Sequence, residues 1–525
     1  MSGEAKARWP LLVGGVALAV HLGCLANGFA LDDVPLVRDN LAVRSFAHVP
    51  ALFLEPYWNV PGESYGLYRP LTIASFAINR ALAGPEPWGF HLANVLLHAA
   101  AAALAWMAIR GAGTHYGGAL AGAGLFAVLP VHTEAVANIA GRAELLAAVL
   151  VLAAWLAHRR ARAGGSPRTI AGAAGLYLAA MLAKESAVLA PLLFACEDAL
   201  AAREGGAGDR RSIATRYGAY AASLGVALAL RWAALGTHQT AESAVFLDNP
   251  AAAAGTVTRV LTALWVQTKL LALCAWPRTL VSDYSFDAIP LVRSLGDPRA
   301  LAGLATAVSV GGAIVWGWRH SRPVAISALT WTIFAAPSSN LFVPAGTIMG
   351  ERLAYLPSLG ACLIVGHLGA AAVARAAEPA ARRRRGWAVG AITVLLASAM
   401  ALRTLARVPA WKDNLTLATG DVVLEPRSAK LQAGAGIFLA AAGRSAEAED
   451  HFLRALEIYP DYAQIHYNLA VLLARRGDDA GDEQHLRRAI AIAPGAPQPY
   501  KALAELLDRS GRQAEAEQVR ATTPR

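Results

Sequence analysis

The stretch WPLLVGGVALAVHLGCLANGFALDDVPLVRDN, residues 9–40, runs from an apolar segment into a pair of aspartates. The apolar part is long enough to cross a membrane, which takes about 20 mostly apolar residues. Asp32 and Asp33 follow at its end, where an ionised carboxylate is costly and two neighbouring ones repel each other. We therefore predict a membrane-embedded chain that uses at least one of these carboxylates at the membrane surface.

The whole chain has the composition of a membrane protein. Of its 525 residues, 56% are hydrophobic and 16% are charged, and the mean hydropathy is +0.40. Soluble domains contain roughly 45–50% apolar and about 25% charged residues. The net charge is +10, but the arginines fall in short clusters between apolar segments. This pattern indicates membrane topology, and we predict no nucleic-acid partner.

About eleven apolar segments are candidate membrane spans, and we interpret the first as an uncleaved span and not as a signal peptide. The segments are residues 9–27, 90–109, 117–131, 143–158, 169–183, 186–200, 214–235, 300–318, 323–337, 355–375 and 386–406. If the basic loops between them face the cytoplasm, they share one side of the membrane. A crossing by residues 256–276 would move every later basic loop to the other side. We therefore predict a non-crossing interfacial or re-entrant helix there.

This topology places most polar motifs on the side away from the cytoplasm. The alanine- and arginine-rich composition is typical of GC-rich bacterial genomes, so we expect a bacterial inner membrane with these motifs in the periplasm. The segments on this side are residues 28–88, the loop within 129–146, KES at 184–186, 236–299, 338–354 and everything after about 407.

Further candidate site residues lie in these outer segments and near their helices. A guanidinium suits a phosphate contact, and a charge near hydrocarbon needs a partner or a polar cavity. The candidates are Arg69, Glu134, Arg142, Lys184, Glu185, Lys269, Asp283, Asn340, Glu351, Arg352 and Tyr355. The competing interpretation is structural: an interfacial anchor for Arg69, a tight hairpin for Lys184 and Glu185, and helix-locking loops or connectors for the others.

The chain changes character after Trp411. Prolines and glycines recur there with a period of 34 residues: Pro426, Pro460 and Pro494, and Gly443, Gly477 and Gly511. This period is typical of tetratricopeptide repeats. We predict a membrane domain over residues 1–410 and a short repeat domain over 411–525, with two complete repeats and a partial third. The repeats could form a helical cap or a concave peptide-binding surface.

Together these motifs resemble the transmembrane and tetratricopeptide-repeat O-mannosyltransferases, within the GT-C class of glycosyltransferases. The resemblance covers nearly the whole chain. The matching elements are LDDVPLVRDN, YRPLT, HLANVLLH, VHTEAVANIAGRAELLA, KES, SDYSF and SSNLFVPAGTIMGERLAYLPSLG, with the repeats at the C-terminal end. The resemblance implies an all-α, polytopic membrane bundle followed by an α-solenoid. It implies transfer of a sugar, usually mannose, from a polyprenyl phosphate to protein Ser or Thr.

The resemblance also carries the acidic motif onto Asp32 and Asp33, and it places Glu351, Arg352 and Tyr355 in the site region. The short repeat array departs from the family and bears on the acceptor protein, which the repeats could hold. We expect one aspartate to act as a general base and a cation among Arg69, Arg142, Lys184, Lys269 and Arg352 to bind the donor phosphate. Displacement at the anomeric carbon would invert its configuration.

Several questions stay open at this level. The sequence does not say which aspartate is the base, which hexose is moved, or whether the acceptor is a protein. H-x-E at His132 and Glu134 is weak evidence for a metal, so we expect no required cofactor, although a divalent cation is possible. Two other functions fit less well: a transporter or ligase of lipid-linked glycans, and a non-catalytic membrane scaffold that presents the repeats.

Overall fold

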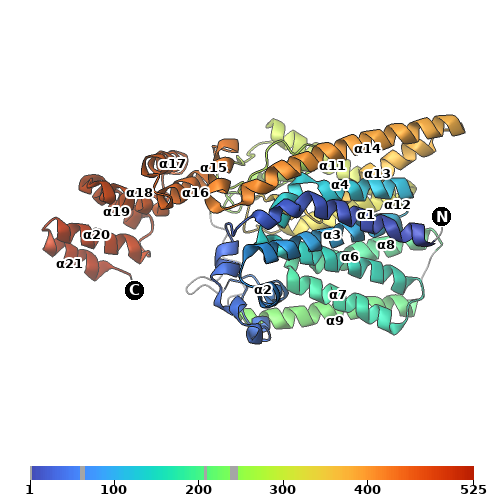
Figure 1. Cartoon of the computed structure of the whole chain (residues 1–525), viewed down its shortest axis with the longest axis horizontal. Helices are drawn as coiled ribbons and strands as arrows, with labels where there is room; N and C mark the ends of the chain where they lie inside the picture. The colour runs from blue at the N-terminus through green and yellow to red at the C-terminus, as the bar shows by residue number, and fades with distance from the viewer. Residues whose placement is uncertain (1–2, 59–65, 206–209, 237–245, 525) are drawn as a thin grey trace. The chain divides into compact units, whose positions relative to one another are not determined.

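The structure, a computed structural model, describes residues 3–58, 66–205, 210–236 and 246–524 (Figure 1). These residues form helices and connecting segments without a β-strand, which confirms the predicted all-α class. The chain separates into two compact units. One comprises Met1–Ser282 with Leu291–Asp413, and the other comprises Asp283–Pro290 with Asn414–Arg525.

Fourteen α-helices make up the described part of the first unit, and short helical turns join several of them. They are α1 (Gly3–His21), α2 (Pro70–Ala83), α3 (Pro87–Gly111), α4 (Tyr116–Val128), α5 (Thr133–Ala137), α6 (Arg142–Arg162), α7 (Pro167–Ala183), α8 (Ala190–Arg203), α9 (Arg210–Leu235), α10 (Thr256–Ala275), α11 (Pro298–His320), α12 (Arg322–Ala335), α13 (Ser358–Ala374) and α14 (Pro379–Arg407). Figure 1 shows α1, α3, α6 and α7 lying side by side.

The predicted count of about eleven spans is not confirmed. Among the described residues, seven helices are long and apolar enough to cross a membrane, or up to eight if α4 and the bent segment after it form one span. Helices α7, α8, α12 and α13 have only 17, 14, 14 and 17 residues. A helix of 14 residues is about 21 Å long, which is shorter than a hydrocarbon core of about 30 Å.

Helix α10 meets the length and composition of a span, yet its two flanks bond to the same connector. Before the helix, Asn249 Nδ2 donates to Asn340 Oδ1 at 2.7 Å. After it, the backbone N–H of Val281 donates to Glu351 Oε1 at 2.7 Å. The segments before and after α10 therefore both bond to the connector between α12 and α13. The non-crossing helix stays a prediction, because length and composition also fit a crossing one.

Charged groups gather at both ends of α6. Arg142 begins this helix, whereas Arg159 lies in its last turn and pairs with the buried Glu197 of α8. Glu197 also pairs with Arg322 at the start of α12, at 2.6 Å. A 21-residue helix is about 30 Å long, so one membrane thickness separates the two groups of charges.

Helices α4 and α13 pack closely because they meet at glycines. Gly118 and Gly122 are four residues apart on α4 and face Gly366 on α13. A Cβ atom at Gly122 would lie 2.6 Å from the carbonyl oxygen of Cys362, and one at Gly366 would overlap the carbonyl oxygen of Gly118. Small residues allow this backbone approach between membrane helices.

The second unit contains the repeats. Its helices are α15 (Asn414–Leu424), α16 (Ala429–Ala441), α17 (Ser445–Ile458), α18 (Ala463–Arg476), α19 (Asp479–Ile492), α20 (Pro497–Arg509) and α21 (Gln513–Thr522). Gly443, Gly477 and Gly511 adopt φ values of 78°, 78° and 75° in the turns after α16, α18 and α20. This left-handed conformation favours glycine, which explains why glycine recurs at that interval.

A segment from the middle of the chain also belongs to the repeat unit. The backbone N–H of Asp287 donates to the carbonyl of Arg427 at 3.1 Å, and the N–H of Ala429 donates to the carbonyl of Phe286 at 2.7 Å. The predicted domain bounds, 1–410 and 411–525, place this segment in the membrane domain. Its hydrogen bonds instead join it to the start of the first repeat.

Replacing Gly122 with Leu should destabilise the membrane unit, because the new side chain would collide with α13. Overpacking of this kind costs about 1–3 kcal/mol. Gly124→Leu is the matched control, since no atom lies within 4 Å of a Cβ built there. We expect a lower Tm for the detergent-solubilised G122L chain, and an unchanged Tm for G124L. Equal Tm values in the two variants would contradict the packing described here.

Candidate active site

Asp33 is a buried carboxylate that fixes the loop after α1. Its Oδ1 accepts the backbone N–H of Ala140 at 2.7 Å, and its Oδ2 accepts that of Ala30 at 3.2 Å. Burial raises the pKa of Asp33 to about 7, although the backbone N–H groups favour the charged form. Asp33 therefore ties the first loop to the turn before α6 and is closed off from a substrate.

Asp32 differs from its neighbour because it is partly exposed and its carboxylate makes no hydrogen bond to a residue that the structure describes. The preceding Leu31 has a φ of 48°, a left-handed conformation that is unusual for a residue other than glycine. The charge of Asp32 influences the pKa of both Tyr57 and Arg352. Burial raises the pKa of Tyr57 to about 12, and the negative charge of Asp32 contributes to this rise. Asp32 is thus the accessible member of the pair.

Arg69 and Glu185 join the start of α2 to the end of α7. The Arg69 guanidinium donates from Nε to Oε2 at 2.8 Å and from Nη2 to Oε1 at 2.5 Å. The hydroxyl of Thr72 donates to the carbonyl of Ala183 at 2.9 Å and holds the same two helices together. The guanidinium carbon lies 4.9 Å from the centre of the Tyr57 ring. This bidentate geometry orients Arg69 and neutralises it.

Lys184 pairs with Glu144 in the first turn of α6, and both side chains are almost fully buried. Burial lowers the pKa of Lys184, whereas the attraction of Glu144 acts in the opposite direction. A buried charge without a partner would be expensive at this depth. The pair therefore keeps a charged lysine inside the unit.

Arg352 pairs with Glu134, which lies on α5. Glu134 accepts the Nη1–H of Arg352 at 2.5 Å and its backbone N–H at 2.8 Å. The attraction of Glu134 raises the pKa of Arg352. The Arg352 side chain is 34% exposed, whereas those of Arg69 and Lys184 are 15% and 8% exposed. Arg352 is thus the most accessible of these three cations.

These side chains form one electrostatic group, which we call the charged cluster. Glu144 connects the ion pairs of this cluster, since its negative charge favours the charged form of both Arg69 and Arg352. Asp32 belongs to the cluster because its negative charge contributes to the raised pKa of Arg352. The members of the charged cluster are Asp32, Arg69, Glu134, Glu144, Lys184, Glu185 and Arg352. The structure therefore brings together candidates from segments spread over about 320 residues of sequence, from Asp32 to Arg352.

Arg142 lies next to the cluster but has a structural role. Its guanidinium donates to the side chains of Asn94 and Asn79 at 2.8 Å each, and to the carbonyl of Phe90 at 2.8 Å. It is buried and stacks over Phe76 at 4.7 Å. Protein acceptors occupy this guanidinium, so it is not available to a donor phosphate.

Tyr355, Asn340 and Glu351 hold the segment that presents Arg352. Tyr355 is buried, and its hydroxyl lies 2.7 Å from His98 Nδ1. Asn340 adopts a φ of 61° and donates to the carbonyls of Thr347 and Ile348 at 3.2 and 3.3 Å. Glu351 is buried and accepts from the segment after α10, as described above. All three side chains are buried and bonded to other parts of the unit.

Two candidates, Lys269 and Asp283, are not members of the charged cluster as defined above. Lys269 lies in the second half of α10. Asp283 belongs to the repeat unit, where it accepts a hydrogen bond from Ser428 Oγ at 3.2 Å and lies 3.8 Å from Lys430 Nζ.

Several partners of the site residues were not predicted from the sequence. Tyr57 and Thr72 lie beside Arg69 and were not candidates, and the pairing of Glu144 with Lys184 was not foreseen. Asn79 and Asn94, polar residues on otherwise apolar helices, were the available signal for the groups that hold Arg142. Among the described residues, no group of three His, Cys, Asp or Glu side chains could hold a metal ion. The metal-independent reaction stays a prediction.

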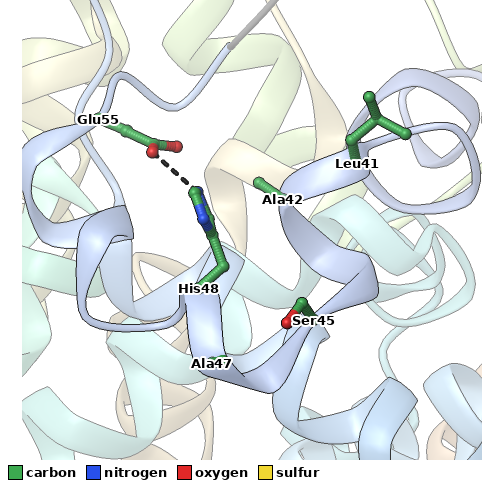
Figure 2. A pocket seen from close by; sticks show the side chains of 6 residues that line it. All are labelled: Leu41, Ala42, Ser45, Ala47, His48 and Glu55. Carbon is green, nitrogen blue, oxygen red and sulfur yellow. Dashed lines mark hydrogen bonds and ion pairs between the residues drawn. The ribbon is translucent and has the colours of Figure 1, made fainter.

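A surface pocket follows the aspartate pair along the chain. The pocket lies in the loop between Leu41 and Glu55 (Figure 2), and its volume is about 470 Å³. His48 Nε2 and Glu55 Oε1 lie 2.8 Å apart at its edge. None of the candidate residues lines this pocket. Its lining residues are Leu41, Ala42, Ser45, Ala47, His48 and Glu55.

Comparisons with known proteins agree with the predicted resemblance. The family model "Protein O-mannosyl-transferase TMTC, DUF1736" matches residues 242–311, and the model "Tetratricopeptide repeat" matches residues 451–484. The chain is 30% identical over 508 residues to "Protein O-mannosyl-transferase Tmtc3" of Drosophila melanogaster, covering 84% of this chain and 54% of that protein. These matches confirm the resemblance and the predicted repeats.

Two human proteins give a similar result. The chain is 29% identical over 490 residues to "Protein O-mannosyl-transferase TMTC3" of Homo sapiens, covering 87% of this chain and 52% of that protein. It is 30% identical over 502 residues to "Protein O-mannosyl-transferase TMTC1" of Homo sapiens, covering 86% and 56%. The chain therefore spans about half the length of these relatives. A solved structure titled "Crystal structure of MamA" matches 25% of this chain and 75% of that chain, with 20% identity and a TM-score of 0.21, a similarity too low to indicate a shared fold.

The pKa of Asp33 predicts a pH-dependent stability. Because this pKa is about 7 in the folded chain and 3.8 in the unfolded chain, the folded state binds an extra proton between these values. The contribution of Asp33 to the free energy of unfolding should therefore fall as the pH rises through this window and stay constant above it. Asp33→Asn should remove this contribution, so that the Tm of D33N in detergent changes with pH differently from that of the unmodified chain between about pH 4 and about pH 8.

Asp39→Asn is the control for this measurement, because Asp39 is exposed and pairs with its neighbour Arg38. The D39N chain should keep the pH dependence of the unmodified chain. A slope that survives unchanged in D33N would show that another group titrates.

Proposed function

We propose that this chain, as a relative of the TMTC protein O-mannosyl-transferases, is a membrane glycosyltransferase that moves a hexose from a polyprenyl phosphate to a protein Ser or Thr hydroxyl. The observation that carries the proposal is the charged cluster, where the accessible carboxylate of Asp32 acts on the accessible guanidinium of Arg352. Both groups belong to loops at the ends of apolar helices. A lipid-linked sugar phosphate reaches such a position from the membrane.

Asp32 is the proposed general base. It would accept the proton of the acceptor hydroxyl as the hydroxyl oxygen attacks the anomeric carbon. The bond between that carbon and the phosphate oxygen breaks, and its electron pair leaves with the polyprenyl phosphate. The configuration at the anomeric carbon is inverted. Asp33 is the positioning partner, since its two bonds to backbone N–H groups hold the loop that carries Asp32.

Arg352 is the proposed contact for the donor phosphate. A guanidinium can offer two parallel N–H groups to a phosphate, and it stabilises the charge that grows on the leaving group. Glu134 binds one edge of Arg352 and its backbone N–H, which leaves part of the guanidinium exposed. Arg69 and Lys184 add positive charge at the back of the site, although their own carboxylate partners reduce their effect.

We further propose that the charged cluster and the repeats face the periplasm of a bacterial inner membrane. Arg159, Arg203 and Arg322 lie at the ends of α6, α8 and α12 that are opposite to the charged cluster. These ends would face the cytoplasm, because cytoplasmic loops of membrane proteins are rich in positive charge. The repeat unit is the proposed contact for the acceptor protein, since repeats of this type commonly offer a concave binding surface.

Asp32→Asn should lower kcat by a hundredfold or more, since a positioned base contributes roughly 10²–10⁴ to the rate. The asparagine keeps the size of the side chain but cannot accept the proton. Transfer of mannose from polyprenyl-phosphate mannose to a Ser- and Thr-rich peptide can be followed by mass spectrometry. Asp39→Asn, on the same loop, should keep full activity. A fully active D32N chain would remove Asp32 from the mechanism and favour a transporter of lipid-linked glycans, which needs cations but no base.

Arg352→Gln should raise the KM for the donor about ten- to hundredfold, because a charge-assisted hydrogen bond contributes about 1.5–3 kcal/mol. The exposed Arg44 is the matched control, and Arg44→Gln should leave this KM unchanged. Initial rates over a range of donor concentrations give both constants. If R352Q and R44Q bind the donor equally well, the phosphate contact lies elsewhere.

A further inference from the structure

A second group of charges lies at the end of α6 opposite to the charged cluster, and we call it the arginine network. No step of the proposed transfer uses its side chains. Arg159 lies about 22 Å along the helix axis from Glu144, a member of the charged cluster. The network joins four helices, α6, α8, α9 and α12, and its members are Arg159, Arg162, Glu197, Asp198, Arg216 and Arg322.

Glu197 is the centre of the network. This carboxylate is fully buried. Three guanidinium groups lie against it: that of Arg322 at 2.6 Å, that of Arg159 at 2.9 Å and that of Arg162 at 3.7 Å. The indole N–H of Trp155 also donates to it. One negative charge therefore faces three positive charges.

Asp198, the next residue on α8, is shared in a similar way. It accepts from Arg216 Nη2 at 2.8 Å and from Arg162 Nη1 at 3.3 Å. His158 Nε2 and the hydroxyl of Tyr217 each lie 3.0 Å from its oxygens. Arg162 thus bridges the two carboxylates. Four guanidinium groups share two carboxylates, so positive charge is in excess within the network.

The carboxylates do not satisfy all the donors of these arginines. Arg159 Nη2, Arg216 Nε and Arg322 Nε are buried without a hydrogen-bond partner among the described residues. Native proteins satisfy nearly all buried polar groups, and an unpartnered donor on a charged side chain is especially costly. Three such donors in one network, together with the excess of positive charge, indicate a site that can accept a further anion.

Two members of the network give an anion access from outside. The side chains of Arg162 and Arg322 are 18% and 19% exposed. Arg322 has one more carboxylate partner, Glu204, at 3.3 Å. The side chain of Glu204 is 55% exposed, so solvent weakens this pair. An anion at the surface can therefore contact Arg162 and Arg322, with the charge of the other arginines behind them.

Tryptophans place the network at the level of the lipid headgroups. Trp316 and Trp318 lie near the end of α11, and the side chain of Trp316 is 53% exposed. Arg203 Nη1 of α8 donates to the carbonyl of Trp318 at 3.0 Å, which joins this end of α11 to the helix that carries the two carboxylates. Tryptophan is enriched where membrane meets water, and basic sites between the ends of membrane helices bind the phosphates of anionic lipids.

We propose that the arginine network binds the phosphate of an anionic phospholipid in the leaflet opposite to the charged cluster, and that Arg162 and Arg322 make the contact. A phosphate diester matches these groups, because a guanidinium can offer parallel N–H groups to its oxygens. Inorganic phosphate has the same chemistry, but the position beside exposed tryptophan favours a lipid. The bound lipid would hold α6, α8, α9 and α12 together at this end. The proposal does not depend on the transfer reaction.

Arg322→Gln tests the proposal, and Arg319→Gln is the matched control because Arg319 is exposed at the same end of the unit. The Tm of the whole chain in a neutral detergent is measured as phosphatidylglycerol, phosphatidylcholine or inorganic phosphate is added. Phosphatidylglycerol should raise the Tm of the unmodified chain and of R319Q, since a ligand of the folded state stabilises it. R322Q should need about ten times more of this lipid for the same rise, the loss expected for one charge-assisted hydrogen bond. Phosphatidylcholine and inorganic phosphate should leave the Tm unchanged.

Glu204→Gln keeps the test decisive if R322Q disturbs the fold. Glu204 is exposed, so its replacement leaves the buried pairs intact and frees one N–H group of Arg322. E204Q should bind phosphatidylglycerol up to about fivefold more tightly, a gain that a purely structural network would not produce. An unchanged response of E204Q to phosphatidylglycerol would overturn the proposal, and so would an unchanged response of a folded R322Q. A rise in Tm with inorganic phosphate or phosphatidylcholine equal to that with phosphatidylglycerol would also overturn it.

Discussion

A charge near hydrocarbon needs a partner, and this constraint organises the membrane unit. Each buried cation of the site has a carboxylate or a set of protein acceptors: Arg69 has Glu185, Lys184 has Glu144, and Arg142 has two asparagines and backbone carbonyls. These pairs join helices that are distant in sequence. The same contacts that satisfy the charges therefore also build the walls of the site.

The two aspartates illustrate how a shared location leads to different roles. Asp33 turns inward, accepts two backbone N–H groups and has a pKa near 7 because it is buried. Asp32 stays partly exposed and acts on Arg352. Burial raises the pKa of Asp33 and so favours its neutral form, which reduces the repulsion between the adjacent carboxylates. This division explains how a chain can keep both acids at the mouth of a membrane helix.

Arg352 shows why a cation can bind a ligand only when part of it is left unsatisfied. Arg142 has the same functional group, but asparagine side chains and backbone carbonyls accept from all three of its nitrogen atoms, so it stabilises the fold. Glu134 pairs with one guanidinium nitrogen of Arg352 and accepts the backbone N–H of the same residue, and the rest of the guanidinium is partly exposed. Sequence could not separate these two arginines, because the difference lies in neighbours supplied by other helices.

The sequence by itself determined the all-α class, the apolar helices and the repeat period, since these follow from local hydropathy and from turns that require glycine at φ near 78°. It also identified most members of the charged cluster, because polar residues at the ends of apolar segments are conspicuous. Only the tertiary structure decided that Asp33 is buried and Asp32 is not, and that residues 283–290 join the repeats. It also decided that four expected spans are short helices. These outcomes depend on which distant segments pack together, and packing between distant segments leaves no periodic trace in the sequence.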